Sequence, residues 1–352
     1  MKRLNNLWQP VISFDNLLSA YYQARRGKQH KSAVAEFTLH LESELFTLQQ
    51  QLTDGSYQPG EYQLFTLYER KPRLIAAAPF RDRVVHHALM NIVEPPIDKQ
   101  FIYDSYACRR SKGVHKAVAR YQNWAKRYHY ALKMDIQQYF PSVNLQLLKQ
   151  KLRHRIKDAQ VLNLFDKIID SSPAITSGTG LPIGNLTSQF LANLYLDDFD
   201  HYVKEQLHIK AYLRYVDDFM VLDDDKKRLH QLRQQIQDYL LVHNRLRLHP
   251  NKAHIVPTHL GVDVLGYVVY PNKRLLRNDN GHRFIRKLRK LEKNYSTDKT
   301  TYADIKPHIM SWIGHAKHAN TYGLRRQIFA NVVWRKKSTA NDEDKRIEGC
   351  RC

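Results

Sequence analysis

The stretch RYVDDFMVL, residues 214–222, places two adjacent carboxylates, Asp217 and Asp218, inside a run of residues that otherwise favours burial. Like charges side by side repel each other, and an ion buried without a partner is costly. The flanking runs AYLRYV and FMVL are β-branched or aromatic, as in a tight hairpin. Two-residue hairpin turns favour Asn-Gly or Asp-Gly, so two aspartates fit a plain exposed turn poorly. Divalent cations explain the pair better, because Mg²⁺ prefers carboxylate oxygens and removes their repulsion.

The same four-residue pattern occurs a second time, as YLDD at 195–198. There it lies within LTSQFLANLYLDDFDHYVKEQL, where apolar residues keep a helical period. We therefore expect one helix over 186–207, with Asp197 and Asp198 on its solvated flank. By this comparison only the stretch at 214–222 is a candidate site.

A phosphoryl-transfer site with two metal ions needs at least one further carboxylate from elsewhere in the chain. Asp135, in ALKMDIQQYF, ends a predicted strand beside a turn at Pro141–Ser142. Taken alone, it also reads as an ordinary strand-terminal aspartate. The charge balance adds weight, because 56 Lys and Arg stand against 34 Asp and Glu, a net charge of +22. Such a field attracts polyanions, nucleic acid first among them, although a merely solvated basic surface has the same composition.

The order of elements predicts an α+β fold. A chain of 352 residues is long for one core and indicates two or three subdomains, and its strands and helices alternate without βαβ regularity. Pro95–Pro96 is expected to end a helix that starts at 81. Further helices are predicted within 11–53, 114–127, 145–170 and 226–243, and strands at 63–80 (two, around ERKP), 129–140, on both sides of Asp217–Asp218, and at 262–270.

Much of the positive charge lies late in the chain. Residues 271–337 hold 17 Lys and Arg and 4 Asp and Glu, so they supply +13 of the net charge. Within them RFIRKLRKLEK, 283–293, reads as an amphipathic helix whose cations suit a phosphate backbone or simply face water. The polar residues 338–352 read as a loose tail.

Cysteine usage and hydropathy indicate a cytoplasmic protein. The three cysteines, Cys108, Cys350 and Cys352, form no metal-binding spacing, so reduced thiols are expected. No stretch has the apolar length of a signal peptide or of a membrane span.

Several blocks, in order along residues 60–270, resemble the reverse transcriptase family. Two resemble its fingers and the others its palm, including the metal hairpin. The blocks are KPRLIAAAPFRDRVVHHAL (71–89), DSYACRRSKGVHKA (104–117), KMDIQQYFPSV (133–143), GLPIGNLTSQFLANLYLDDFD (180–200), RYVDDFMVL (214–222), LRLHPNKAHIV (246–256) and LGYVV (265–269).

This resemblance implies a right-hand polymerase of fingers, palm and thumb, with an antiparallel palm sheet flanked by helices. The implied division is an N-terminal helical extension (1–59), fingers (60–128), palm (129–270, with finger-related helices inserted at about 145–180), a basic helical thumb (271–337) and the tail (338–352). A bacterial, archaeal or phage-encoded cytoplasmic enzyme is implied, with template RNA, the cDNA primer–template and dNTPs as partners and no membrane.

The resemblance also implies the catalytic residues. Asp135 and Asp217 would hold two Mg²⁺ ions, for which Mn²⁺ can substitute, and Asp218 would complete the acidic set. Arg73 matches the fingers arginine that contacts the incoming triphosphate, since a planar cation suits phosphate oxygens. Lys252 matches a lysine that protonates pyrophosphate, although exposed lysines are abundant in this chain.

Other matched positions concern the nucleotide and the primer. Phe140 stands where the family places a ring under the sugar, which excludes a 2′-hydroxyl and selects dNTPs; its alternative role is a core phenylalanine. Gly266 resembles the glycine of the primer grip. In LPIGNLTSQ, Ile183 and Gln189 replace the commoner glutamine and proline. Isoleucine at 183 offers no hydrogen bond near the incoming sugar, so discrimination against a mispair should weaken by about 1–3 kcal/mol.

This variant block is similar to the reverse transcriptases of diversity-generating retroelements. Those enzymes copy a template RNA with errors concentrated at adenines, and a small basic accessory protein assembles with them. Retron, group II intron-like and phage-defence reverse transcriptases are the alternatives, although the sequence carries no HNH-like Cys/His cluster, RNase H-like acidic set or long maturase extension. A catalytically idle nucleic-acid-binding scaffold is opposed by the three aspartates, and an RNA-templated RNA polymerase by Phe140.

Overall fold

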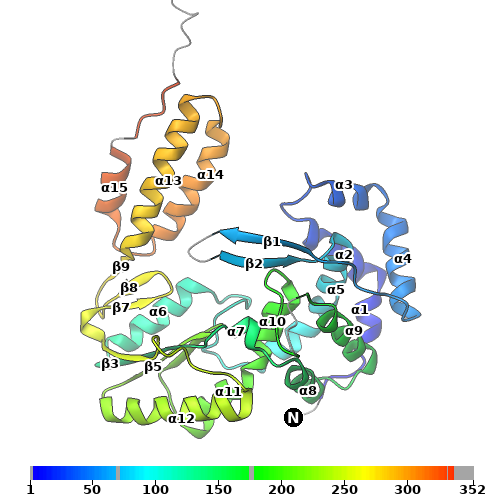
Figure 1. Cartoon of the computed structure of the whole chain (residues 1–352), viewed down its shortest axis with the longest axis horizontal. Coiled ribbons are helices and arrows are strands. Elements are labelled where there is room, and N and C mark those ends of the chain that lie inside the picture. Colours follow the sequence, from blue (N-terminus) through cyan, green and yellow to red (C-terminus); the bar gives the residue numbers. More distant parts are fainter. Residues whose placement is uncertain (1–2, 69–71, 174–177, 331, 337–352) are drawn as a thin grey trace, which may run out of the picture. The chain divides into compact units, whose positions relative to one another are not determined.

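The computed structural model describes residues 3–68, 72–173, 178–330 and 332–336 (Figure 1). It divides into two compact units: the first comprises residues 1–117 and 132–255, and the second comprises 118–131 and 256–352. Helices and antiparallel strand pairs occur in both units, as the predicted α+β class requires. The predicted tail, 338–352, lies outside the described residues.

Five helices build the start of the first unit: α1 (Trp8–Ile12), α2 (Phe14–Arg25), α3 (Ser32–Leu39), α4 (Leu41–Thr53) and α5 (Phe80–Asp98). The prediction that α5 would stop at Pro95–Pro96 is wrong, because the helix continues through both prolines to Asp98. A helical proline costs about 3 kcal/mol. Val93 and Ile97, on either side of the prolines, are fully buried, and their burial holds the last turn against that cost.

The strands predicted around ERKP are confirmed as β1 (Gln63–Tyr68) and β2 (Pro72–Ala77), which pair antiparallel. A second sheet has the strand order β4-β5-β3-β6. Its members are β3 (Tyr130–Asp135), β4 (Tyr212–Tyr215), β5 (Asp218–Asp223) and β6 (His254–Pro257). Figure 1 shows α12 (Lys226–Asn244) running along one face of this sheet, where it buries Leu229, Leu232, Ile236 and Leu240 at helical spacing.

The helices between β3 and β4 are α7 (Tyr139–Ser142), α8 (Leu145–Arg155), α9 (Ala159–Asp170), α10 (Leu186–Tyr195) and α11 (Asp197–His201), followed by a π-helical turn, η1 (Tyr202–Gln206). The single helix predicted over 186–207 is therefore wrong, since it breaks at Leu196. The carbonyl of Tyr195 accepts hydrogen bonds from Lys151 Nζ at 2.7 Å and from Asn244 Nδ2 at 3.2 Å. These side-chain donors compete with the backbone N–H that would continue the helix.

The second unit contains most of α6 (Val114–Ala125), the short 3₁₀ turn η2 (Thr258–Leu260), a three-stranded sheet and three helices. The strand predicted over 262–270 is two strands, β7 (Val262–Val264) and β8 (Tyr267–Val269), which form a hairpin and continue to β9 (Arg274–Leu276). Leu265 and Gly266 both have positive φ, +50° and +95°. Positive φ at both central residues is the requirement of a type I′ turn, so the chain reverses there instead of extending.

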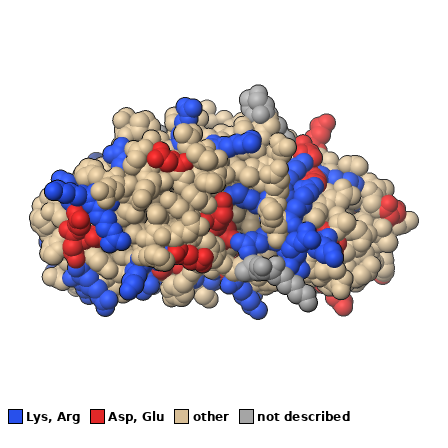
Figure 2. Space-filling model, turned by 90° about the horizontal axis from the view of Figure 1, so that it is seen from below, with Lys and Arg blue, Asp and Glu red and all other residues tan. Residues whose placement is uncertain are grey.

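The helix predicted at 283–293 is confirmed as part of α13 (Asn278–Ser296), which is followed by α14 (Tyr302–Ala316) and α15 (Tyr322–Ala330). Phe284, Leu288 and Leu291 form its buried stripe, and the Phe284 ring stacks on Trp312 with centroids 4.0 Å apart. In the view of Figure 2, Lys and Arg side chains are spread over the visible surface of the molecule, with smaller groups of Asp and Glu between them. Among the described residues, no helix is both long and apolar enough to cross a membrane.

Candidate active site

The hairpin at the centre of the site has a two-residue turn. β4 pairs with β5 in a register that places Tyr215 opposite Asp218, so the turn consists of Val216 and Asp217. Asp218 is the first residue of β5 rather than part of the turn. Val216 has a φ of +59°, and Asp217 does not have a positive φ. A positive φ at the first turn residue alone is a position that hairpins usually give to glycine.

Asp135 lies at the end of β3, next to this turn. The backbone N–H of Ile136 donates to the carbonyl of Asp217 at 3.2 Å, and the N–H of His249 donates to the carbonyl of Asp135 at 2.8 Å. The end of β3 is therefore held between the hairpin turn and the segment that leads to Lys252. These backbone contacts bring together three residues that are 35 to 117 positions apart in sequence.

Neighbouring charges act in opposite directions on the Asp217 carboxyl group. Burial raises the pKa of the Asp217 carboxyl above its ordinary value, and the Asp135 carboxylate raises it further; Lys252 and Arg73 act in the opposite direction. Lys252 Nζ lies 2.8 Å from Asp135 Oδ2. The structure thus places Asp135, Lys252 and Arg73, all singled out from the sequence, within electrostatic reach of Asp217.

Asp218 has a different neighbour. Its Oδ2 lies 3.7 Å from Lys133 Nζ. Lys133 is two residues before Asp135, so both side chains lie on one face of β3. The described part of the chain contains no group of three or more His, Cys, Asp or Glu side chains close enough to hold a metal ion. Asp135 and Asp217 fit a divalent cation, because carboxylate oxygens are its preferred ligands and their repulsion is what it would relieve.

The residues expected around the nucleotide lie on segments that hydrogen bonds connect. Arg73 is exposed on β2. The N–H of Ala76, on the same strand, donates to the carbonyl of Ile183 at 2.9 Å, and the N–H of Leu181 donates to the carbonyl of Phe140 at 2.8 Å. Phe140 is half-buried, on α7. The loop of Ile183 therefore joins the strand of Arg73 to the short helix of Phe140.

Two further expected residues are Gln189 and Gly266. Gln189 is exposed on α10. Gly266 belongs to the second unit, in the β7–β8 turn, where its carbonyl accepts a hydrogen bond from the N–H of Arg277 at 3.2 Å. The nucleotide role of Gln189 and the primer role of Gly266 stay predictions.

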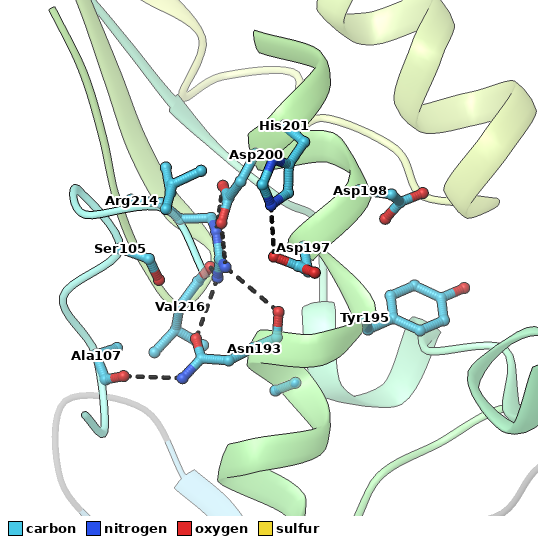
Figure 3. Close-up of polar contacts among 12 residues, drawn as sticks. Ser105, Ala107, Asn193, Tyr195, Asp197, Asp198, Asp200, His201, Arg214 and Val216 are labelled. Carbon is cyan, nitrogen blue, oxygen red and sulfur yellow. Dashed lines mark hydrogen bonds and ion pairs between the residues drawn. The ribbon is translucent and has the colours of Figure 1, made fainter. Parts of the chain in front are cut away.

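Sequence reasoning missed a buried polar network behind the hairpin (Figure 3). Arg214 and Asp200 are both fully buried and form an ion pair, with Arg214 Nη2 2.6 Å from Asp200 Oδ2. Arg214 Nη1 also donates to the carbonyl of Val216 at 3.0 Å. The signal in the sequence was an arginine directly before the YVDD stretch, within a strand that otherwise buries its side chains.

The prediction of a solvated flank at Asp197 and Asp198 is wrong for Asp197. Asp197 is 2% exposed, forms an ion pair with Arg155 and, by its hydrogen bond to His201, raises the pKa of that imidazole to about 9. Asp198 is partly exposed but its Oδ1 lies 2.5 Å from Lys151 Nζ. Both carboxylates form ion pairs with cations on α8. Helical periodicity in the sequence does not report partners that lie on another helix.

Comparison with known proteins decides the family. The sequence profile described as "Reverse transcriptase (RNA-dependent DNA polymerase)" matches residues 66–269, more than half of the chain. The chain belongs to the reverse transcriptase family. It is accordingly a nucleotidyltransferase of the RNA-directed DNA polymerase class with a reverse transcriptase fold, as its motif blocks predicted.

Individual relatives of this reverse transcriptase are distant. It is 26% identical to protein YkfC of Escherichia coli (strain K12) over 268 residues, 64% of this chain and 70% of that protein. It is 24% identical to the putative COX1/OXI3 intron 2 protein of Saccharomyces cerevisiae over 36% of this chain, but only 16% of that protein. It is 27% identical to nuclear intron maturase 1, mitochondrial, of Arabidopsis thaliana over 26% of this chain and 13% of that protein.

Solved structures also resemble the chain, among them the following two. A chain of a partial Cas6-RT-Cas1–Cas2 complex has a TM-score of 0.39 at 24% identity, covering 67% of this chain and 42% of that one. Telomerase from Candida albicans, in complex with a fragment of telomeric RNA, has a TM-score of 0.46 at 11% identity, covering 83% of this chain and 57% of that one.

Proposed function

We propose that this reverse transcriptase makes cDNA by two-metal nucleotidyl transfer, with Asp135 and Asp217 as the central metal ligands and Asp218 as the third carboxylate. One observation carries the proposal: in a chain of net charge +22, the end of β3 that bears Asp135 is hydrogen-bonded to the hairpin turn that bears Asp217, through Ile136 N–H and the Asp217 carbonyl at 3.2 Å. The Asp135 carboxylate there adds to the burial that raises the pKa of Asp217. A nucleic-acid binder gains nothing from opposed carboxylates beside its phosphates, whereas metal-assisted phosphoryl transfer requires them.

Each residue then has a stated task. Bound Mg²⁺, or Mn²⁺ in its place, would lower the pKa of the primer 3′-hydroxyl and neutralise the pyrophosphate leaving group. Lys252, 2.8 Å from Asp135, holds a proton beside the reacting phosphates and gives it to pyrophosphate. Arg73 binds the triphosphate. The ring of Phe140 excludes a 2′-hydroxyl, and so selects dNTPs.

We further propose that the enzyme is the error-prone polymerase of a diversity-generating retroelement, with errors directed to template adenines. The support is the block LPIGNLTSQ, in which Ile183 cannot donate or accept a side-chain hydrogen bond. The hydrogen bond from Ala76 N–H fixes the backbone at this position, so a base pair would meet an apolar side chain held in place. Template RNA, the cDNA primer–template and a small basic accessory protein oligomer are the proposed partners, in a cytoplasmic setting.

The domain assignment belongs to the same proposal: N-terminal extension 1–59, fingers 60–128, palm 129–270 and thumb 271–337. Within the palm and thumb, Gly266 would grip the primer and the cations of α13 would follow the template–primer backbone. Gln189 would line the nucleotide site from α10. Retron, group II intron-like and phage-defence enzymes are the alternatives within the family.

Primer extension on an RNA template, with Mg²⁺ and dNTPs, tests the polymerase. The variant Asp217→Ala/Asp218→Ala should lose extension, because the metal ligands are gone. Asp223→Ala is the matched control, since this carboxylate ends the same strand and pairs with Arg228 at the surface. Absence of extension by the wild-type enzyme, with cognate RNA and accessory protein supplied, would support the idle-scaffold alternative.

Sequencing the products tests the retroelement assignment. Errors concentrated at adenines support it, whereas faithful extension favours a retron or defence enzyme. Ile183→Gln should lower adenine misincorporation by restoring a hydrogen-bonding side chain. Ile183→Leu, which restores none, should keep the wild-type spectrum; equal spectra for the glutamine variant and the wild type would remove Ile183 from the explanation.

A further inference from the structure

The hairpin that carries Asp217 contains a conformation that needs support. Val216, the turn residue directly before Asp217, has a φ of +59°. β-Branched residues rarely adopt positive φ, and such a conformation persists only where the surroundings determine it. The pairing of β4 with β5 fixes the two ends of the turn, because Tyr215 lies opposite Asp218. It does not by itself fix the plane of the peptide between Val216 and Asp217.

The guanidinium of Arg214 supplies that support. Its Nη1 donates to the carbonyl of Val216 at 3.0 Å, and this carbonyl belongs to the peptide that joins Val216 to Asp217. The same group binds Asp200 through two bonds, Nε to Oδ1 at 2.8 Å and Nη2 to Oδ2 at 2.6 Å. A planar fork held at both carboxylate oxygens has its remaining N–H directions fixed. One of those directions is occupied by the Val216 carbonyl.

The anchor is itself rigid. Arg214 and Asp200 are 0% exposed, and the hydroxyl of Tyr212 donates to Asp200 Oδ1 at 2.6 Å. Asn193 on α10 accepts a bond from Arg214 Nη1 at 3.3 Å and donates to the carbonyl of Ala107 at 2.8 Å (Figure 3). α10 and α11 thus both contact one guanidinium, and the 104–107 segment holds the Asn193 amide that contacts it.

The backbone of Arg214 is fixed as well. Its N–H donates to the carbonyl of Asp104 at 3.0 Å, and its carbonyl accepts from the N–H of Tyr106 at 2.9 Å. The segment 104–106 therefore runs beside β4, on the edge away from β5. Buried ion pairs are weak contributors to stability, because desolvation cancels much of the attraction. The Arg214–Asp200 ion pair therefore serves the site by fixing the orientation of the guanidinium rather than by adding stability.

We propose that Arg214, held by Asp200 and Asn193, is a positioning residue that fixes the Val216–Asp217 peptide and thereby aims the Asp217 carboxylate at the metal. This inference rests on the proposed polymerase function. It concerns a residue that touches neither metal nor substrate, and it assigns to the residue before the YVDD stretch a role in the rate of the chemical step.

Single-turnover primer extension over a range of Mg²⁺ concentrations tests it with Arg214→Lys. Lysine keeps the buried charge but has no fork, so it cannot hold both Asp200 oxygens and the Val216 carbonyl. The rate constant should fall about 10- to 100-fold and the Mg²⁺ concentration for half-maximal rate should rise. Affinity for the template–primer should not change. A purely structural defect would instead lower the amplitude, which counts folded enzyme, and leave the rate constant and the Mg²⁺ dependence alone.

Arg228→Lys is the matched control, because Arg228 pairs with Asp223 at the other end of β5 and is half exposed. If Arg214→Lys does not fold, Arg214→Met/Asp200→Asn takes its place. This double variant leaves no uncompensated buried charge, and the introduced asparagine amide can still accept the hydrogen bond from Tyr212. The fold should therefore persist without a donor to the Val216 carbonyl.

The two proposals fail separately. A wild-type enzyme that does not extend primers, with cognate RNA and accessory protein supplied, refutes the proposed catalytic mechanism. A wild-type enzyme that extends them, beside a folded Arg214 variant with the wild-type rate constant and Mg²⁺ dependence, refutes the positioning role alone.

Discussion

Gly184 is the position at which one added methyl group should separate the loop of Ile183 from β2. It has a φ of +125°, and a Cβ built there would lie 2.9 Å from the carbonyl oxygen of Ala76 and 3.0 Å from Ile75 Cγ2. The first of these atoms belongs to the backbone of a paired strand and cannot rotate away. In Gly184→Ala the loop must therefore move, and the bond between Ala76 N–H and the Ile183 carbonyl is the contact that it would lose.

The cost has two parts. A non-glycine residue at this φ costs about 1–3 kcal/mol. Overpacking against fixed atoms costs about 1–3 kcal/mol, less whatever the loop relieves by moving. We expect a total of about 2–4 kcal/mol. Gly178→Ala is the matched control in the same chain segment, because its φ is +78° and a Cβ there meets nothing within 4 Å. Backbone strain alone should cost that variant about 1 kcal/mol.

Equilibrium urea unfolding, followed by far-ultraviolet circular dichroism, gives the free energies of unfolding. Primer extension under saturating dNTP then shows whether the moved loop also slows incorporation. The reasoning is refuted if the two alanine variants differ by less than about 0.5 kcal/mol, because surface substitutions without a steric conflict lie within that range. An equal loss in both would mean that only the backbone conformation, and not the approach to β2, matters at Gly184.

Three further predictions concern other parts of the first unit. Asp158→Ala should lower the free energy of urea unfolding by about 2–4 kcal/mol, because this carboxylate accepts hydrogen bonds from the N–H groups of Leu7, Trp8 and Val161 and so caps both α1 and α9. The control, Asp225→Ala, removes one cap from α12 and should cost about 1 kcal/mol. Equal losses in the two variants would contradict the double cap. Burial, with smaller effects of His87 and Arg83, lowers the pKa of His86 from 6.5 to about 3, so between these two pH values the unfolded chain binds one more proton than the folded chain. The contribution of His86 to the free energy of unfolding should therefore be fully present above pH 6.5 and should fall by about 1.4 kcal/mol per pH unit as the pH drops towards 3. His86→Leu should flatten that slope, and an unchanged slope would show that the assignment is wrong. Phe140→Val should raise rNTP use relative to dNTP about 10- to 100-fold in competitive incorporation, and an unchanged ratio would return Phe140 to an ordinary core role.

The candidate site was largely readable from sequence because its parts are local patterns. β-Branched and aromatic residues predict the two strands of the hairpin, and the carboxylate at its turn interrupts that apolar pattern. Asp135 was found in the same way, at the end of its own strand. What joined these pieces was the order of the family's blocks. The errors occurred where a local rule met a distant partner, as with the helix that continues through Pro95–Pro96 and the one that breaks at Leu196.

Two YxDD stretches show the limit most clearly. Helical period separated them in sequence, and on that basis Asp217 was predicted to be the site residue, which stays a prediction. The same reasoning assigned Asp197 to solvent, although Arg155, 42 residues earlier, holds it in the interior. A helical period reports which residues share a face, but not whether another helix brings a cation to that face.

The sequence by itself determined the class of fold, the family, and the acidic residues that sit at the hairpin and at the end of β3. Only the tertiary structure decided which charges are buried and what they hold, as with Arg214, Asp200 and the Val216 carbonyl. The reason is physical. Secondary structure follows from neighbours along the chain, whereas the cost of burying a charge depends on whether the fold delivers its counter-charge, and that partner has no fixed distance in sequence.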